Sequence, residues 1–162
     1  RPGVPAGTTH AAELVEAALA LSHFPEHPVP DGDVEILQTF AIVKVPGEAS
    51  FSVDGGPADI LLRPDLDHLN FSELRPGAGF GRLGNGKQHR LVVAPGAEGE
   101  TGVDLDSYFM YEDDEIRLAR PAVPAMLTLD PQAVRLDCLG YLMRRIGRDG
   151  LPLGEARNRQ GD

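Results

Sequence analysis

The sequence contains a single cysteine, Cys138, so no disulfide can form within the chain and a disulfide scaffold is excluded. A lone cysteine makes a reducing compartment the simpler expectation, and we therefore expect a cytoplasmic protein. No run of apolar residues reaches the length of a membrane span, and no secretory h-region is present. The sequence begins with Arg1 and not with Met, which leaves open whether a targeting segment has been removed.

Basic residues are also scarce, because 15 Lys and Arg stand against 25 Asp and Glu and give a formal net charge of -10. Nucleic acids and anionic membranes bind clustered Lys and Arg, so this charge argues against both as the main partner. The sequence also lacks a Gly-x-Ser-x-Gly motif, so no serine nucleophile can be assigned from it.

The centre of the predicted organisation is the stretch from Val34 to Val45, which is rich in β-branched and aromatic residues. Apolar side chains fall on both alternating faces, as in a strand that is covered on both sides. Turn-forming residues bound this stretch, with Asp31-Gly32 before it and Pro46-Gly47 after it. We therefore predict a central strand around which the rest of the chain packs.

Helical patterns occur near both ends of the sequence. An apolar stripe at helical spacing predicts a helix from about His10 to Ser22, with Thr8-Thr9 as its N-cap. Asp130-Pro131 is typical of a helix start, and it predicts a second helix that ends at Gly147 or Gly150.

The segments between these helices are short and alternate in polarity, and 14 prolines and 19 glycines supply many turns. We therefore predict one α+β domain over residues 8–150, with an N-terminal helix and a C-terminal helix. Its main part is an antiparallel β sheet, sandwich or barrel-like. Residues 1–7 are predicted to form a flexible arm, and residues 151–162 a polar, frayed tail.

Glycine is most frequent between Arg75 and Gly86, where two phosphate-binding patterns match on paper. Gly79 to Gly84 satisfies Gly-x-Gly-x-x-Gly, and Gly81 to Lys87 satisfies the first part of a P-loop. Both patterns need a helix to follow, and the residues from Lys87 to Ala94 favour a strand instead. We therefore predict a mobile loop or hairpin, which can still form a binding surface through Arg82, Lys87 and Arg90.

Asp65, Asp67 and His68 place two carboxylates and an imidazole within four positions. Together with His89 they are candidates for a catalytic or hydrolytic site, because a carboxylate can orient an imidazole. The alternative is a polar turn after Pro64 in which an aspartate caps backbone amides. No metal site is predicted.

The densest charge in the sequence is acidic, and its spacing does not match a calcium-binding loop. One interpretation is a solvated strand face and turn, and another is a charged edge that blocks unwanted sheet pairing. A third is a binding surface for a basic partner. The residues are Asp104, Asp106, Glu112, Asp113, Asp114 and Glu115.

These observations favour a non-enzymatic, β-rich binding or assembly module that docks protein partners or copies of itself as a homo-oligomer. Cys138 is predicted to be a buried structural thiol, and no cofactor is predicted. The alternative hypothesis is a small-molecule enzyme or ligand-binding protein with a sheet-lined pocket that uses Asp65, Asp67, His68 and His89.

Overall fold

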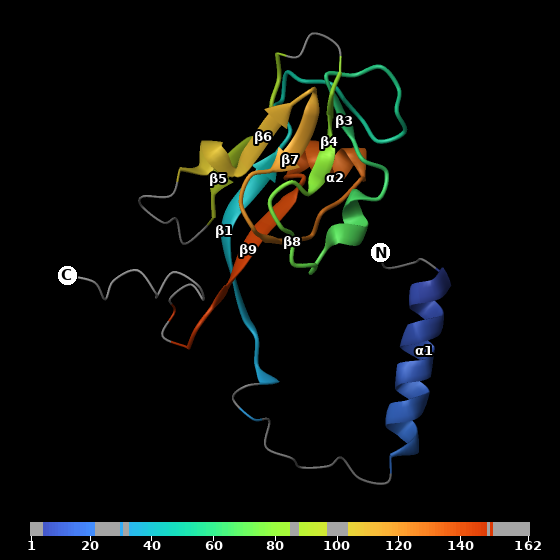
Figure 1. The fold of residues 1–162 in the computed structure, drawn as a ribbon. Coiled ribbons are helices and arrows are strands. Elements are labelled where there is room, and N and C mark those ends of the chain that lie inside the picture. The colour runs from blue at the N-terminus through green and yellow to red at the C-terminus, as the bar shows by residue number, and fades with distance from the viewer. Residues whose placement is uncertain are drawn as a thin grey trace, which may run out of the picture. The chain divides into compact units, whose positions relative to one another are not determined.

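The structure is a computed structural model that describes residues 5–21, 30, 33–84, 88–96, 104–148 and 150. Contacts within the chain divide it into two compact units, Arg1–Val34 and Glu35–Asp162. The first unit contains the helix α1 (Pro5–Ala20), and the second contains the β sheets (Figure 1).

The second unit consists mainly of short strands. The strands are β1 (Ile36–Lys44), β2 (Phe51–Ser52), β3 (Ile60–Leu62), β4 (Gly79–Leu83), β5 (Val92–Pro95), β6 (Phe109–Glu112), β7 (Glu115–Leu118), β8 (Val123–Ala125) and β9 (Gly140–Ile146). Among the described residues of this unit, two 3-10 helices and one α-helix lie between the strands. The helices are η2 (Leu66–Leu69), η3 (Leu105–Tyr108) and α2 (Pro131–Leu136).

The predicted central strand is confirmed as β1, which lies inside a sheet of strand order β5-β1-β9-β8. All neighbours in this sheet are antiparallel. Ala41 is paired with Pro95 of β5 on one side and with Leu142 of β9 on the other. Ala41 and Val43, which lie on the same face of β1, are fully buried, whereas residues 36–39 and Ile42 are only partly buried.

The second sheet has the strand order β2-β3-β4-β7-β6. Only β2 and β3 are parallel, and the remaining neighbours are antiparallel. The predicted class, α+β with mainly antiparallel sheet, is therefore confirmed. Neither sheet closes on itself, so the barrel-like alternative is wrong.

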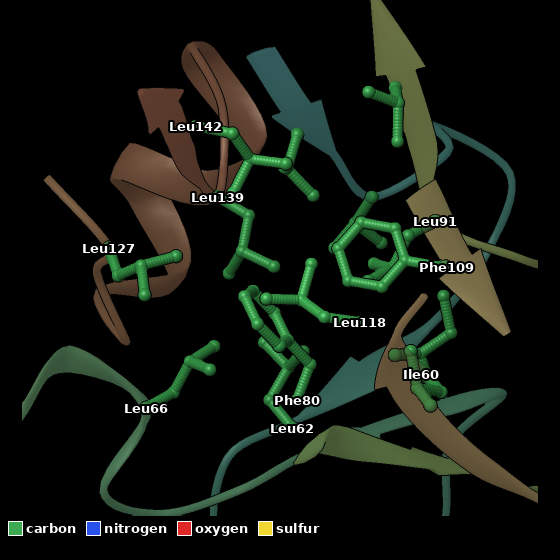
Figure 2. Close-up of a cluster of buried hydrophobic side chains, with 14 of the residues drawn as sticks. Ile60, Leu62, Leu66, Phe80, Leu91, Phe109, Leu118, Leu127, Leu139 and Leu142 are labelled. Atoms are coloured by element: carbon green, nitrogen blue, oxygen red, sulfur yellow. The ribbon is translucent and has the colours of Figure 1, made fainter. Parts of the chain in front are cut away.

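Side chains from both sheets meet in one buried cluster, which Figure 2 shows in close-up. The rings of Phe80 and Phe109 pack edge to face with their centroids 5.0 Å apart. Such pairs add roughly 0.5–1.5 kcal/mol to the burial of the rings themselves. The other members labelled in the figure are Ile60, Leu62, Leu66, Leu91, Leu118, Leu127, Leu139 and Leu142.

The predicted mobile loop or hairpin is wrong for Gly79–Leu83, because these residues form the strand β4, which pairs with β3 and β7. A side chain on Gly81 would collide with the carbonyl oxygen of Leu61 in the neighbouring strand β3. A side chain on Gly84 would collide in the same way with the carbonyl oxygen of Ala58. Glycine therefore permits close approach of two backbones at both positions.

The predicted C-terminal helix is wrong over most of its length, because α2 ends at Leu136 and residues 140–146 form β9. The helix start is correct, since the Asp130 carboxylate accepts a hydrogen bond of 2.9 Å from the Gln132 amide. β9 pairs with β1 and with β8, which satisfies its backbone groups and buries Leu142 completely. Pairing inside the sheet thus overrides the helical spacing of the apolar residues.

The N-terminal helix is present, but α1 begins at Pro5, so Thr8 and Thr9 lie within it and do not cap it. Proline is favoured in the first turn of a helix, where its missing N–H costs nothing. Residues 1–4, Ser22 and the predicted tail over residues 151–162 lie outside the described residues. Within the described part of the chain, no helix combines the length and apolar character that a membrane crossing requires.

Candidate functional site

The candidate site lies where residues 70–74 form hydrogen bonds with residues 122–127, a segment that includes β8. Leu74 and Ala122 form an isolated antiparallel bridge, with N–H to oxygen distances of 2.9 and 3.1 Å. The Phe71 amide donates a hydrogen bond of 2.7 Å to the carbonyl oxygen of Pro124. These bonds cover the edge of β8 that does not face β9 and fix the path of both segments.

The Asn70 side chain ties the two segments together most directly. Its Nδ2 donates to the Leu127 carbonyl oxygen at 3.0 Å, and its Oδ1 accepts from the Leu127 amide at 2.7 Å. Nδ2 also donates to the carbonyl oxygen of Asp67 in η2 at 2.9 Å. Because Leu127 is 3% exposed and packs in the core, Asn70 anchors this surface to the interior.

Two large apolar side chains project from these tied segments into solvent. Phe71 is 70% exposed and Met126 is 67% exposed. Both residues have left-handed backbone, with φ of 60° at Phe71 and 53° at Met126. We name Phe71 and Met126 the apolar site. Left-handed backbone costs a residue with a side chain about 1–2 kcal/mol, and strain of this kind clusters at binding and switch regions.

A group of three charged side chains includes Glu73, which lies two residues after Phe71 in the sequence. Arg145 of β9 forms an ion pair with Glu73 at 2.8 Å and a second one with Glu35. Hydrogen bonds to Glu35 and then to Glu73 raise the pKa of Arg145 above its usual range. This group links β9 to the segment that carries Phe71.

The predicted catalytic candidates fall into two places. Asp65 and His68 lie in the turn that follows β3, where Asp65 accepts hydrogen bonds of 2.7 and 2.6 Å from Arg63. These bonds are the main cause of the lowered pKa of Asp65. Asp67 contributes its carbonyl oxygen to the Asn70 interaction. The predicted polar turn thus exists, although its hydrogen bonds differ from the expected aspartate caps.

His89 lies near a different carboxylate, at the other end of β3. The hydrogen bond from the Ser50 hydroxyl is the main cause of the lowered pKa of Asp59, and the neighbouring His89 is a smaller cause. Ser50 donates from its hydroxyl at 2.7 Å and from its amide at 2.8 Å to Asp59. Among the described residues, no group of three or more His, Cys, Asp or Glu side chains could hold a metal ion. The enzyme hypothesis therefore stays a prediction that no contact described above supports.

The predicted basic residues of the glycine-rich region have separate partners. Arg82 on β4 forms an ion pair with Glu115 on β7, with a distance of 3.5 Å. The Arg90 guanidinium lies 4.7 Å from the centroid of the Tyr111 ring, which is a cation–π contact. Burial raises the pKa of Tyr111 to about 12, and its hydroxyl accepts a hydrogen bond from the Leu91 amide. Lys87 lies outside the described residues.

The acidic residues divide into a helical turn and a hairpin turn. Asp104 and Asp106 lie at the start of η3, so the prediction that they share a strand face is wrong. The strand begins only at Phe109, because residues 105–108 turn as a 3-10 helix. The turn between β6 and β7 is confirmed: Glu112 and Glu115 are paired across it. Asp113 and Asp114 form its two central positions.

Cys138 is buried in the structure, as predicted. Burial is the largest cause that raises the pKa of its thiol above the usual range.

Sequence reasoning missed the apolar site entirely. Phe71 lies in a stretch that is compatible with either strand or turn, and Met126 lies in a stretch that resembles a strand. Neither residue type favours left-handed backbone, so no local signal indicates it. The one usable hint is Asn70, whose amide side chain can replace a backbone partner.

Comparisons with known proteins identify no relative. No protein-family model matches the sequence, and no curated protein and no solved structure matches it.

Proposed function

We propose that this chain is a non-enzymatic, β-rich binding module that docks a protein partner through the apolar site, or assembles with copies of itself. The observation that carries the proposal is the apolar site, where two large side chains are held in solvent by strained backbone. Folding alone gains little from this arrangement, because the exposed side chains contribute little burial and the backbone costs energy.

A partner that covered Phe71 and Met126 would gain the free energy of burying their side chains. Burial of a Phe or Met side chain is worth roughly 1.5–3 kcal/mol each. Aromatic anchors of this kind often carry most of the binding energy of an interface. The hydrogen bonds of Asn70 and Phe71 hold both backbone segments in place, so little flexibility is lost on binding.

The charge of the chain indicates what kind of partner fits. With a net charge of -10, the chain repels acidic proteins and attracts neutral or basic ones. The apolar site is therefore suited to an apolar pocket or groove in a protein that is neutral or basic. The acidic turn at Asp113-Asp114 would add to this attraction at long range.

The test compares the apolar site with an exposed apolar residue elsewhere. Photo-crosslinking residues are placed at Phe71 and, as the control, at Leu136 of α2, which is also exposed. Proteins captured at Phe71 and not at Leu136 are purified, and their affinity for the chain is measured by calorimetry.

Phe71→Ser and Met126→Ser are expected to weaken this affinity at least tenfold each, which corresponds to about 1.4 kcal/mol. Leu136→Ser is expected to leave it unchanged. Equal affinity for all four chains would overturn the proposal, because the apolar site would then take no part in binding.

A further inference from the structure

The segment from residue 130 to residue 147 carries the local signals of one continuous helix, although in the structure it contains both α2 and β9. Asp130 and Pro131 begin α2 as such signals predict. Further along, the helix formers Leu-Met-Arg-Arg follow one another at residues 142–145, inside the strand β9. The basic residues around Gly147 would suit the C-terminus of a helix that continued to this glycine.

Tertiary hydrogen bonds take the chain out of the helix at Leu139. The Leu139 amide donates to the carbonyl oxygen of Val43 at 2.8 Å, and the Leu139 carbonyl oxygen accepts from the Thr128 amide at 3.1 Å. In a continued helix, the Leu139 amide would instead donate to the carbonyl oxygen of Arg135, four residues earlier. Both observed partners lie outside the segment, so its own residues do not specify the end of α2.

The strand β9 depends in the same way on a distant partner. Every residue of β9 is paired with β1, which precedes it by most of the second unit. Pairing between strands so far apart in sequence takes on the order of milliseconds to seconds, whereas a helix forms in about 0.1–1 μs. The local helical signals therefore act before β1 is available.

The length of the segment favours a transient helix. With six residues, α2 alone is shorter than the roughly 12–15 residues that an isolated helix needs. A helix over residues 131–146 would have roughly four turns and would reach this length. Gly140 lies inside it and weakens it, as glycine does in any helix interior. Such a helix is partial, so it can give way when a better partner arrives.

We propose that residues 131–146, the switch segment, are helical until β1 is in place and that residues 140–146 then convert into the strand β9. The conversion postpones β9 until its neighbour exists, so an apolar strand is not left with unpaired edges that aggregate. This inference goes beyond the proposed function and does not depend on it.

The test is refolding of the full chain from urea, followed by stopped-flow circular dichroism in the far ultraviolet. The early helical signal is expected to exceed that of the native protein, because residues 140–146 add to the helices that persist. Pulsed hydrogen exchange locates this helix. The amides of β9 are expected to gain partial protection before those of β1, whereas direct strand pairing would protect both together.

Asp137→Ala and Asp137→Gly form a matched pair, because both remove the same carboxylate at the C-terminus of α2. Alanine favours continuation of the helix and glycine opposes it, so the helix-to-coil ratio of the switch segment is expected to be about fivefold higher in Asp137→Ala. The early helical signal is expected to differ accordingly. The sheet is expected to form up to about fivefold more slowly in Asp137→Ala, since more helix must melt first.

Glu48→Ala and Glu48→Gly, in the turn after β1, are the control pair and are expected to give equal early signals. An early signal no stronger than the native one would overturn the proposal, as would simultaneous protection of β1 and β9. Equal early signals in Asp137→Ala and Asp137→Gly would assign any excess helix to another segment and would also overturn it. If a variant does not refold, hydrogen exchange of the wild type decides alone.

Discussion

Left-handed backbone at residues other than glycine occurs in two places within the described residues. One is the turn between β6 and β7, at Asp113 and Asp114 with φ of 49° and 69°. The other is the apolar site, at Phe71 and Met126 with φ of 60° and 53°. The same conformation thus appears in a polar turn and under two exposed apolar side chains.

The causes of the conformation differ between the two places. A two-residue hairpin turn of type I′ needs positive φ at both central positions, and its twist matches that of the flanking strands. Aspartate tolerates it better than most residues. At the apolar site the residues tolerate it poorly, and contacts with a segment 57 positions away hold it. Local connectivity explains the first case, and tertiary hydrogen bonds explain the second.

Among the substitutions that test this comparison, removal of the Asn70 side chain is expected to lower the free energy of unfolding most. Asn70→Ala deletes both hydrogen bonds to Leu127 and leaves backbone groups at a buried residue without those partners. We expect a loss of about 2–4 kcal/mol in the free energy of unfolding, measured by urea denaturation. The control is Ser72→Ala in the same exposed segment, and a loss of similar size there would contradict the role of Asn70.

Gly140→Ala tests the packing of Leu127, the residue that follows Met126, against β9. A Cβ at residue 140 would lie 2.8 Å from Cδ2 of Leu127 and 3.0 Å from its backbone. We expect a loss of about 1–3 kcal/mol in the free energy of unfolding, because the segment that carries Met126 must shift. Gly47→Ala, where the space is open, serves as the control and is expected to change stability little. Equal effects at both glycines would contradict the close packing at Leu127.

Asparagine at the strained positions separates strain from binding. Phe71→Asn and Met126→Asn keep a residue that adopts left-handed backbone readily and remove the apolar side chain. We expect each variant to raise the free energy of unfolding by up to about 1 kcal/mol and to bind the partner more weakly. A gain in stability with full affinity would show that the strain serves no binding function. A loss of stability would show that Phe71 and Met126 contribute to the fold.

Substitutions in the acidic turn at Asp113 and Asp114 are expected to change stability and affinity least. Asp113→Asn/Asp114→Gly installs the residue pair that type I′ turns prefer, and should raise the free energy of unfolding by roughly 0.5–1 kcal/mol. Affinity for the partner is expected to fall slightly and only at low salt, because the carboxylates act through long-range attraction. A loss of affinity as large as that of Phe71→Ser would move the binding surface to this turn.

The sequence predicts the elements whose signals are local. The strand β1 follows from a run of β-branched and aromatic residues, and the acidic turn follows from its composition. β9 could not be predicted in the same way, because its apolar residues also fit a helical face and only pairing with β1 decides between the two.

The candidate site also depends on tertiary contacts that the local sequence does not indicate. Nothing in the neighbourhood of Phe71 or Met126 indicates left-handed backbone, because the hydrogen bonds that enforce it join distant segments. The glycines in and directly after β4 had a misleading local signal, since Gly81 and Gly84 serve backbone contacts with β3 and its preceding residues. Signals that depend on a tertiary partner become visible only after the chain is folded.

The pairing of β1 with β9 has a consequence for how the protein folds. The two strands join residues 36–44 to residues 140–146, so the ladder forms only after synthesis has passed Ile146. Until then β1 lacks the neighbour that covers one of its edges. Such long-range pairing slows folding, and unpaired apolar strands aggregate. We therefore expect the nascent chain to depend on chaperones until β9 leaves the ribosome.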